Sequence, residues 1–283
     1  MRKSTWWWSG IVLALLLWVP FSVCGMGVDQ ERKVSVLTWN IHHGTDHQGR
    51  LDLERTAEVI RESGAELVAL QEVDRHWSDR SRFTDQARIL GEKLDMWVCF
   101  APIYSLDPQK EGEPRREYGL AILSRYPITS FKNHELSRIS SLEPERGIQS
   151  LPGFPEAVIN LKGQKVHLFN THLSWMDADL RLKEAEEMLD IMAKADHPVI
   201  LTGDMNALPG TREIHRLEQE MTDTFEAAGE GDGFTYPVLD PRRRIDFIFS
   251  SREIRALDSR VIQDVGSDHY PVLSVLEVPK QIH

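Results

Sequence analysis

Cysteine is scarce in this chain of 283 residues, which contains only Cys24 and Cys99. Cys24 lies in the apolar N-terminal stretch, so cleavage of that stretch would leave Cys99 alone and exclude an intrachain disulfide. Cys99 stands between Val98 and Phe100. We therefore expect it to be a small buried hydrophobic residue rather than a catalytic thiol.

Positive charge is also in deficit, because 33 lysines and arginines face 44 acidic residues and the formal net charge is −11. Loss of Arg2 and Lys3 with a leader would leave 31 basic residues and a charge of −13. Proteins that bind nucleic acid without sequence preference carry the opposite excess, since they must neutralise phosphates. The composition disfavours a general DNA or RNA binder and still allows a local basic cleft.

Long apolar runs are missing except at the N-terminus. Residues 1–25 contain two basic residues and then an uncharged run from Ile11 to Val23. This pattern is typical of a signal peptide and is short for a membrane span. Cleavage, lipidation of Cys24, and retention as a membrane anchor with Trp6–Trp8 at the interface all stay open. We expect an exported protein, either secreted or attached to the outer face of the membrane.

The remaining chain shows no repeat and no low-complexity linker, and we expect one folded domain over residues 33–278. Short apolar runs alternate with helical patterns, which indicates mixed β-sheets covered by helices. Helices are expected at 51–64, at 83–94 with Thr84 as its cap, and at 177–194. Strands are expected at 34–39, 66–70, 96–102, 118–124, 157–161, 166–173, 198–203, 244–250 and 271–278. A polar loop is expected at 105–117, and residues 144–150 are interpreted as the opening of an edge strand.

Polar residues follow the apolar strands at the points where the strands end or begin. The segment VILTGDMNALPG (199–210) shows this best, because a buried strand stops at Asp204 and Asn206. Other strand ends carry Asn40, the pair Gln71-Glu72, His172, Asp246 and the pair Asp268-His269. Catalytic groups are often carried on loops beyond strand ends, so these residues are expected to meet at one rim of the sheets.

Such a cluster has a chemical rationale. Neighbouring carboxylates repel each other unless they share a cation, and oxygen ligands without paired thiols favour Mg²⁺ or Mn²⁺ over a structural Zn²⁺. Histidines and amides are then suited to hydrogen-bond phosphoryl oxygens. Taken singly, each piece has a plainer explanation, since Asp-Xaa-Asn before Pro-Gly is also good turn chemistry.

In chain order, the pieces closely resemble the endonuclease/exonuclease/phosphatase superfamily of metal-dependent phosphohydrolases. The resemblance implies an α/β (α+β) fold, namely a four-layer α/β/β/α sandwich of two mixed β-sheets with helices outside. The resembling blocks are TWNIHHG (38–44), LVALQEVD (67–74), YGLAILSRYPI (118–128), NTHL (170–173), GDMNALP (203–209), RIDFIF (244–249) and SDHYPV (267–272).

The resemblance also implies roles for individual residues. Glu72 resembles the principal metal ligand, with Asn40 and Asp268 as further metal-site residues. Asp204 resembles the group that orients or deprotonates the attacking water. The residues implied to hold phosphate or stabilise the transition state are His172, Asn206, His269 with its orienting partner Asp246, and, more weakly, Tyr118.

We therefore expect an exported, monomeric, Mg²⁺-dependent enzyme that cleaves a phosphodiester or phosphomonoester, with Mn²⁺ as the alternative metal. A small or lipid-linked substrate is favoured over nucleic acid; a secreted nuclease and a catalytically inactive binding module are the alternatives. The Trp175-Met176 pair is the only nearby candidate for lipid contact, with core packing as its alternative. Candidate phosphate-steering groups, with solvated surface arginines as the alternative, are Arg115, Arg116, Arg146, Arg242, Arg243 and Arg244.

Overall fold

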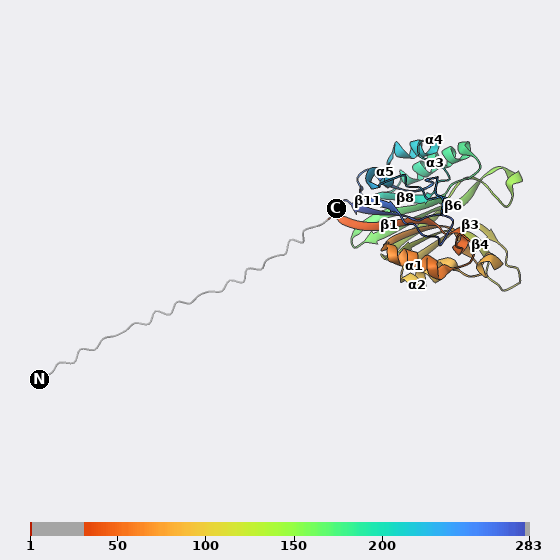
Figure 1. Cartoon of the computed structure of the whole chain (residues 1–283), viewed down its shortest axis with the longest axis horizontal. Coiled ribbons are helices and arrows are strands. Elements are labelled where there is room, and N and C mark those ends of the chain that lie inside the picture. The colour runs from red at the N-terminus through yellow and green to blue at the C-terminus, as the bar shows by residue number, and fades with distance from the viewer. Residues whose placement is uncertain (2–30, 281–283) are drawn as a thin grey trace. The chain divides into compact units, whose positions relative to one another are not determined.

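Two six-stranded β-sheets pack face to face and helices cover their outer faces in the computed structural model, which describes residue 1 and residues 31–280 (Figure 1). The first sheet has the order β11–β12–β1–β2–β4–β3. Its strands are β1 (Arg32–Asn40), β2 (Leu67–Arg75), β3 (Trp97–Leu106), β4 (Arg116–Ser124), β11 (Arg255–Val261) and β12 (Val272–Val278). Residues 31–280 belong to one compact unit.

The second sheet has the order β5–β6–β7–β8–β10–β9. Its strands are β5 (Ile128–Ile139), β6 (Ile148–Leu161), β7 (Gln164–His172), β8 (Val199–Asp204), β9 (Met221–Asp223) and β10 (Asp246–Ser251). Both sheets mix parallel and antiparallel pairs, so the predicted four-layer sandwich is confirmed.

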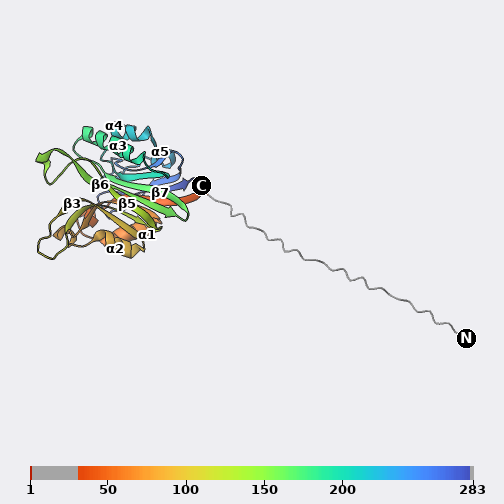
Figure 2. The same ribbon diagram turned by 180° about the vertical axis from the view of Figure 1, so that it is seen from behind.

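The helices form the two outer layers, as both views show (Figures 1 and 2). On one side lie α1 (Leu53–Ser63) and α2 (Gln86–Leu94); on the other lie α3 (Ala178–Met192), α4 (Arg212–Glu218) and α5 (Thr224–Ala228). Three short 3-10 helices are η1 (His42–Gly44), η2 (Asp79–Ser81) and η3 (Pro144–Arg146). No helix within the described part of the chain has the length and apolarity needed to cross a bilayer.

Strand β1 shows how alternation builds the layers. Val34 and Val36 point into the core between the sheets, while Leu37 and Trp39 pack on the opposite face in the core that includes α1. Because successive side chains of a strand point to opposite faces, one strand serves two cores. A third core lies between the second sheet and α3 and α4, around Phe169 and Phe247.

Several predicted boundaries shift by a few residues. Helix α1 is capped by Asp52 and stops at Gly64, whose φ of 71° suits glycine. The prediction of Thr84 as the cap of α2 is wrong: the Asp85 carboxylate accepts the Arg88 N–H at 3.0 Å, while the Thr84 hydroxyl donates to Ser81 O. The predicted polar loop 105–117 is shorter, because β3 and β4 extend into it.

The prediction that residues 144–150 open an edge strand is correct only in part, because β6 does begin at Ile148. Residues 144–146 form η3, and β6 lies inside the sheet between β5 and β7. Five elements, β5, β9, β11, α4 and α5, have no counterpart among the elements predicted from the sequence. Cys99 is only half-buried, because β3 is an edge strand; burial nevertheless raises the pKa of its thiol. The predicted leader over residues 1–25, with Cys24, lies outside the described residues apart from residue 1.

Two parallel strand pairs set the position of the functional residues. Strands β1 and β2 run parallel, and their pairing ends where Asn40, the last residue of β1, lies beside Gln71 in the middle of β2. Strands β7 and β8 run parallel and pair His172 with Asp204. Strand β10 is antiparallel to β8 and begins with Asp246 opposite Asp204. Both sheets therefore deliver polar side chains to the same edge of the sandwich.

Candidate active site

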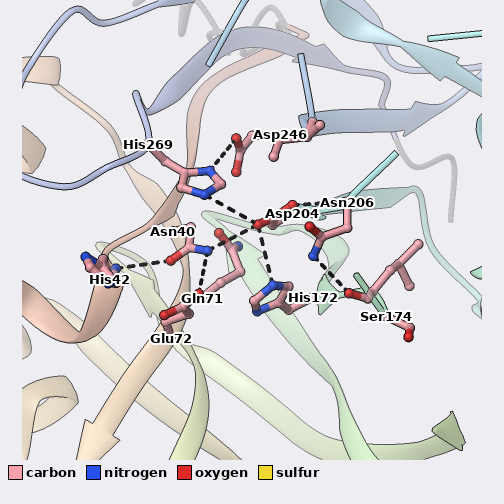
Figure 3. Close-up of polar contacts among 12 residues, drawn as sticks. Asn40, His42, Gln71, Glu72, His172, Ser174, Asp204, Asn206, Asp246 and His269 are labelled. Carbon is pink, nitrogen blue, oxygen red and sulfur yellow. Dashed lines mark hydrogen bonds and ion pairs between the residues drawn. The ribbon is translucent and has the colours of Figure 1, made fainter. Parts of the chain in front are cut away.

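A cavity of about 440 Å³ opens at this edge of the sandwich. It is lined by eight of the nine residues that the sequence predicted for the site, and the ninth, Asp246, lies behind His269 (Figure 3). The eight lining residues are Asn40, Glu72, Tyr118, His172, Asp204, Asn206, Asp268 and His269.

Asp204 is held at the centre of the site by main-chain and side-chain donors. Its Oδ1 accepts the Asn206 N–H at 2.9 Å, and its Oδ2 accepts Asn40 Nδ2 at 3.1 Å. Oδ2 also lies 3.5 Å from His172 Nε2. Gly203 precedes it with φ 154°, and a Cβ there would lie 2.2 Å from Thr171 O, so only glycine allows β7 and β8 to approach this closely. The turn fixes the carboxylate while leaving it at the cavity wall.

His269 connects two aspartates. Its Nδ1 lies 2.9 Å from Asp246 Oδ2, and its Nε2 lies 3.8 Å from Asp204 Oδ2. Burial lowers the pKa of His269, but the charge and hydrogen bond of Asp246, followed by the charge of Asp204, raise it to about 10. Burial raises the pKa of Asp246, and the His269 charge partly offsets this. The ring is therefore an imidazolium at neutral pH, oriented by a buried carboxylate.

Glu72 reaches the cavity through a β-bulge. The pairing of β2 with β4 shifts register between Leu70 and Val73, and Glu72 has φ 57°. Bulges of this kind re-aim a side chain beside a functional site. Glu72 Oε1 accepts Asn40 Nδ2 at 3.0 Å, and Oε2 lies 3.8 Å from His43 Nδ1. Burial raises the pKa of Glu72, but His43 and the charge of His172 outweigh it and hold the pKa well below its usual range.

Two sets of residues could in principle bind a divalent cation. Asp204, Asp246 and His269 offer ligand atoms that all lie within 4.8 Å of one another. However, the His269 ring is already held by Asp246 through Nδ1, which leaves Asp246 and His269 engaged with each other. The ionised Glu72 carboxylate and the half-exposed Asp268 carboxylate face the same cavity, and they fit a hard cation better.

The Asn40 side-chain amide makes hydrogen bonds through both its nitrogen and its oxygen. Its Nδ2 donates to both Glu72 and Asp204, and its Oδ1 accepts the His42 N–H at 3.1 Å (Figure 3). The amide thus bridges carboxylates that come from different sheets. Asn40 Oδ1 keeps a second lone pair beside this hydrogen bond, so its geometry is compatible with the predicted metal-site role.

The segment after β7 is held by charged side chains that the sequence analysis missed. Arg138 Nη1 donates to His172 O at 2.9 Å, and Glu184 Oε2 accepts the Ser174 N–H at 3.0 Å. Asn206 Nδ2 donates to Leu173 O at 3.0 Å between them. Arg138 and Glu184 lie 3.7 Å apart and are both buried. This clamp fixes the backbone that carries His172.

Two amide side chains, Gln71 and Asn170, join the two sheets behind the cavity. Gln71 Nε2 donates to Asn170 Oδ1 at 2.7 Å, and Asn170 Nδ2 donates to Leu70 O. Gln71 was already expected at the rim as part of the Gln71-Glu72 pair, whereas Asn170 stood out only as the first residue of the NTHL block. The sequence signal for these residues was their spacing, because Gln71 directly precedes Glu72 and Asn170 lies two positions before His172. Tyr104 lines the cavity and stacks on Tyr118, with ring centroids 6.0 Å apart.

The arginines and the Trp175-Met176 pair singled out from the sequence differ in whether they line the cavity. Of the six arginines predicted to steer phosphate, only Arg243 lines the cavity. Trp175 and Met176 also line it, and with 71% and 57% exposure they are surface residues rather than core residues.

Comparisons with known proteins agree with this geometry. Residues 37–269 match the model of the Endonuclease/Exonuclease/phosphatase family. The uncharacterized protein YbhP of Escherichia coli is 28% identical over 262 residues, which cover 86% of this chain and 96% of YbhP.

Solved structures share the fold. An endonuclease/exonuclease/phosphatase from Beutenbergia cavernae superposes with a TM-score of 0.70 at 24% identity, covering 87% of this chain and 72% of that one. A mannosyl-6-phosphatase of Bacteroides thetaiotaomicron superposes with a TM-score of 0.63 at 19% identity, covering 86% and 99%. The family match spans most of the chain and both sheets. The chain therefore belongs to the endonuclease/exonuclease/phosphatase family and is a hydrolase that acts on phosphoric ester bonds.

Proposed function

We propose that the protein is an exported, Mg²⁺-dependent phosphohydrolase that cleaves a small or lipid-linked phosphodiester or phosphomonoester by in-line attack of water. The observation that supports this most is the placement of Asp204. Its Oδ2 lies between the His172 and His269 imidazoles, in a cavity that Glu72 and Asp268 also line.

The chain's own groups account for the proton and charge movements. In this proposal Asp204 accepts a proton from water as the water oxygen bonds to phosphorus, and the bond to the leaving-group oxygen breaks. The His269 imidazolium and His172 donate hydrogen bonds to the non-bridging oxygens as negative charge builds on them. The leaving alkoxide takes a proton from solvent.

Glu72 and Asp268 would hold the cation, with Mn²⁺ as the alternative to Mg²⁺. When bound, such a cation neutralises phosphoryl charge and orients the substrate. Asn40 would keep Glu72 and Asp204 at a fixed separation, because it donates to both carboxylates.

The surface near the cavity supports a small or lipid-linked substrate over nucleic acid. Trp175 and Met176 place exposed apolar area on the cavity lining. Arg115 and Arg146, which a nucleic-acid groove could have used, pair instead with Asp107 and Glu143. Exposed apolar surface beside a catalytic cavity suits an acyl-bearing or aromatic substrate better than a polyanion.

A substrate panel tests this function. Plasmid DNA, sphingomyelin vesicles, inositol phosphates and bis(p-nitrophenyl) phosphate are incubated with Mg²⁺ or with chelator, using the wild type and Asp204→Ala. We expect hydrolysis of a small or lipid substrate with Mg²⁺ alone, and a loss of roughly 10²–10⁴-fold in Asp204→Ala at unchanged circular dichroism. Activity that survives chelator contradicts the metal role, and cleavage of DNA alone favours the nuclease alternative.

Export and membrane attachment are part of the proposal and rest on the sequence of residues 1–25. Intact mass measurement of the protein recovered from each cell fraction tests them. A mature chain outside the cytoplasm, shortened near residue 25 or lipidated at Cys24, is the expected result. Full-length protein confined to the cytoplasm would contradict export.

A further inference from the structure

Arg243 differs from its two arginine neighbours in its environment. Arg242 is exposed and pairs with Asp240, whereas Arg244 is buried and lies 2.8 Å from Asp223. Arg243 is exposed and lines the catalytic cavity. Within residues 31–280, no hydrogen bond or ion pair engages its guanidinium. Three consecutive arginines therefore include one whose charge is uncommitted.

The position of Arg243 is fixed by its main chain. Arg243 O accepts the N–H groups of Thr235 and Tyr236 at 2.8 and 3.0 Å, and Arg243 N donates to Tyr236 O at 3.0 Å. The Tyr236 ring packs on the His269 ring with centroids 4.7 Å apart. The start of the Arg243 side chain is thus held at a set place relative to His269.

The charge of the cavity makes this guanidinium significant. Four carboxylates line the cavity, from Glu72, Glu184, Asp204 and Asp268. The other lining arginine, Arg138, is buried and donates to two main-chain carbonyls. Among the described lining residues, Arg243 is therefore the one exposed arginine that an anionic substrate meets.

We propose that Arg243 binds a second anionic group of the substrate, so that the preferred substrate carries a phosphate or carboxylate in addition to the scissile phosphoester. This inference rests on the proposed function. His172, Asn206 and His269 already gather around Asp204, where the scissile group reacts, and Arg243 enters the cavity from the separate 236–243 loop. A planar guanidinium binds phosphate or carboxylate oxygens through paired hydrogen bonds.

Three matched ligands test the inference, namely glucose 1-phosphate, glucose 1,6-bisphosphate and glucuronic acid 1-phosphate. They differ only at carbon 6, which carries a hydroxyl, a phosphate or a carboxylate. Calorimetric Kd values are measured with Mg²⁺ in the Asp204→Asn background, alone and combined with Arg243→Ala, Arg243→Lys or Arg242→Ala. The Arg242 variant is the matched control, because it removes a neighbouring charge that does not line the cavity.

We expect glucose 1,6-bisphosphate or glucuronic acid 1-phosphate, each of which carries a second anionic group, to bind more tightly than glucose 1-phosphate. Arg243→Ala should reduce that difference in Kd about tenfold, as for loss of one charge-assisted hydrogen-bond pair. Arg243→Lys should restore part of it, and Arg242→Ala should leave it unchanged. Whether the phosphate or the carboxylate shows the effect identifies the group.

Equal weakening of all three ligands would place Arg243 on the scissile phosphate and overturn the inference. So would a preference that Arg243→Ala leaves intact, or the absence of any preference in the Asp204→Asn protein. Calorimetry needs no turnover. If the binding preference depends on Arg243 but the wild-type protein hydrolyses no phosphoester, the proposed function is contradicted and the inference about Arg243 stands.

Discussion

Asp204 and Asp246 are two buried carboxylates with different partners. Asp204 accepts hydrogen bonds from Asn40 and from the Asn206 main chain, whereas Asp246 has the His269 ring as its neighbour. Burial raises the pKa of Asp246, and the charge of the His269 imidazolium opposes this rise and so favours the carboxylate that orients the ring. Two chemically identical side chains one strand apart are thus assigned different tasks by their surroundings.

Asp246→Asn tests the orienting role at the residue scale. The substitution keeps the shape and removes the charge that holds the His269 imidazolium, so we expect kcat to fall about 10²-fold with KM changed much less. The measurement is steady-state kinetics on the substrate found in the panel. Asp240→Asn, an exposed aspartate paired with Arg242, is the control. Unchanged kcat in a folded Asp246→Asn protein would remove His269 orientation from the mechanism.

Residue identities were predictable where a strand end and a known block coincided, as for Glu72, Asp204 and His269, which the structure brings to one cavity. Arg138 and Glu184 were not, because Arg138 lies 34 positions from His172, whose carbonyl it reaches, and Glu184 lies on a helix whose pattern does not show that its side chain turns back to Ser174 N. A sequence pattern shows which side chains are present. It does not show which main-chain carbonyl a distant arginine will reach.

At the scale of elements, the short segment after β7 is controlled from three directions. Arg138 comes from β5, Glu184 comes from α3 and Asn206 follows β8, and all three bond consecutive main-chain groups. Burial raises the pKa of Glu184, against the lowering effect of the Arg138 charge. Helix α3 therefore contributes to the active site without carrying a residue that touches Asp204.

Arg138→Met should displace this segment and leave Glu184 as a buried carboxylate without its cation. We expect a loss of about 3–5 kcal/mol in the free energy of unfolding, as for other broken buried pairs, and a lower kcat through His172. Denaturant unfolding and steady-state kinetics give the two values. The double variant Arg138→Met/Glu184→Gln should be more stable than Arg138→Met, and a double variant of lower stability would contradict the pairing.

A second buried network joins β5, β6 and β7 away from the cavity. Glu156 lies 2.6 Å from both His134 Nε2 and His167 Nδ1, and His167 Nε2 lies 2.9 Å from Asp196. The hydrogen bonds from His134 and then His167 lower the pKa of Glu156 to about 2. Burial lowers the pKa of His167, but Glu156 and then Asp196 raise it overall.

This network should make stability depend on pH in a defined window. Stability from Glu156 is present above its unfolded pKa near 4.5 and is lost as pH falls toward 2. Stability from His167 is complete below its unfolded pKa near 6.5 and is lost as pH rises through its higher folded value.

Glu156→Gln should therefore cost most between about pH 4.5 and 6.5, by roughly 1–3 kcal/mol, and less at pH 3 or pH 9. Urea unfolding of both proteins at these pH values measures the difference. Glu135→Gln, which removes an exposed carboxylate from the same strand pair, is the control. A cost independent of pH would show that packing, not charge, holds the network.

Element prediction from the sequence succeeded where the periodicity was long and failed for short or irregular pieces. The pattern of α3 was found within a few residues, whereas β5 was missed because its exposed face is polar for most of its length. β9 and α5 span only three and five residues, too short for any periodicity to show. Tertiary packing decides such pieces.

On the scale of the whole molecule, each of the two sheets contributes one parallel pair of strands to the site. β1 and β2 bring Asn40 and Glu72, and β7 and β8 bring His172 and Asp204. The Asn40 amide then joins carboxylates of both sheets. A substitution that loosens the packing between the sheets should therefore lower the catalytic rate, even when the substituted residue lies far from the cavity.

Cation binding should stabilise the whole fold, because the proposed ligands belong to different segments of the chain. With Mg²⁺ at about 100 times its Kd, we expect a gain of about 2.7 kcal/mol and a Tm higher by a few degrees, reversed by chelator. Glu72→Gln should abolish the shift, while Glu117→Gln should retain it. A shift that persists in Glu72→Gln would place the cation elsewhere.

Strand β1 enters the first sheet at Arg32 and reaches the catalytic edge at Asn40, and Val278 at the end of β12 pairs with Arg32. Nine residues of strand correspond to roughly 30 Å between that entrance and the chemistry. A solid support or a fusion partner joined at either end of the folded unit would therefore leave the catalytic opening facing outward, so that the immobilised enzyme should draw its substrate from the surrounding solution rather than from the surface to which it is fixed.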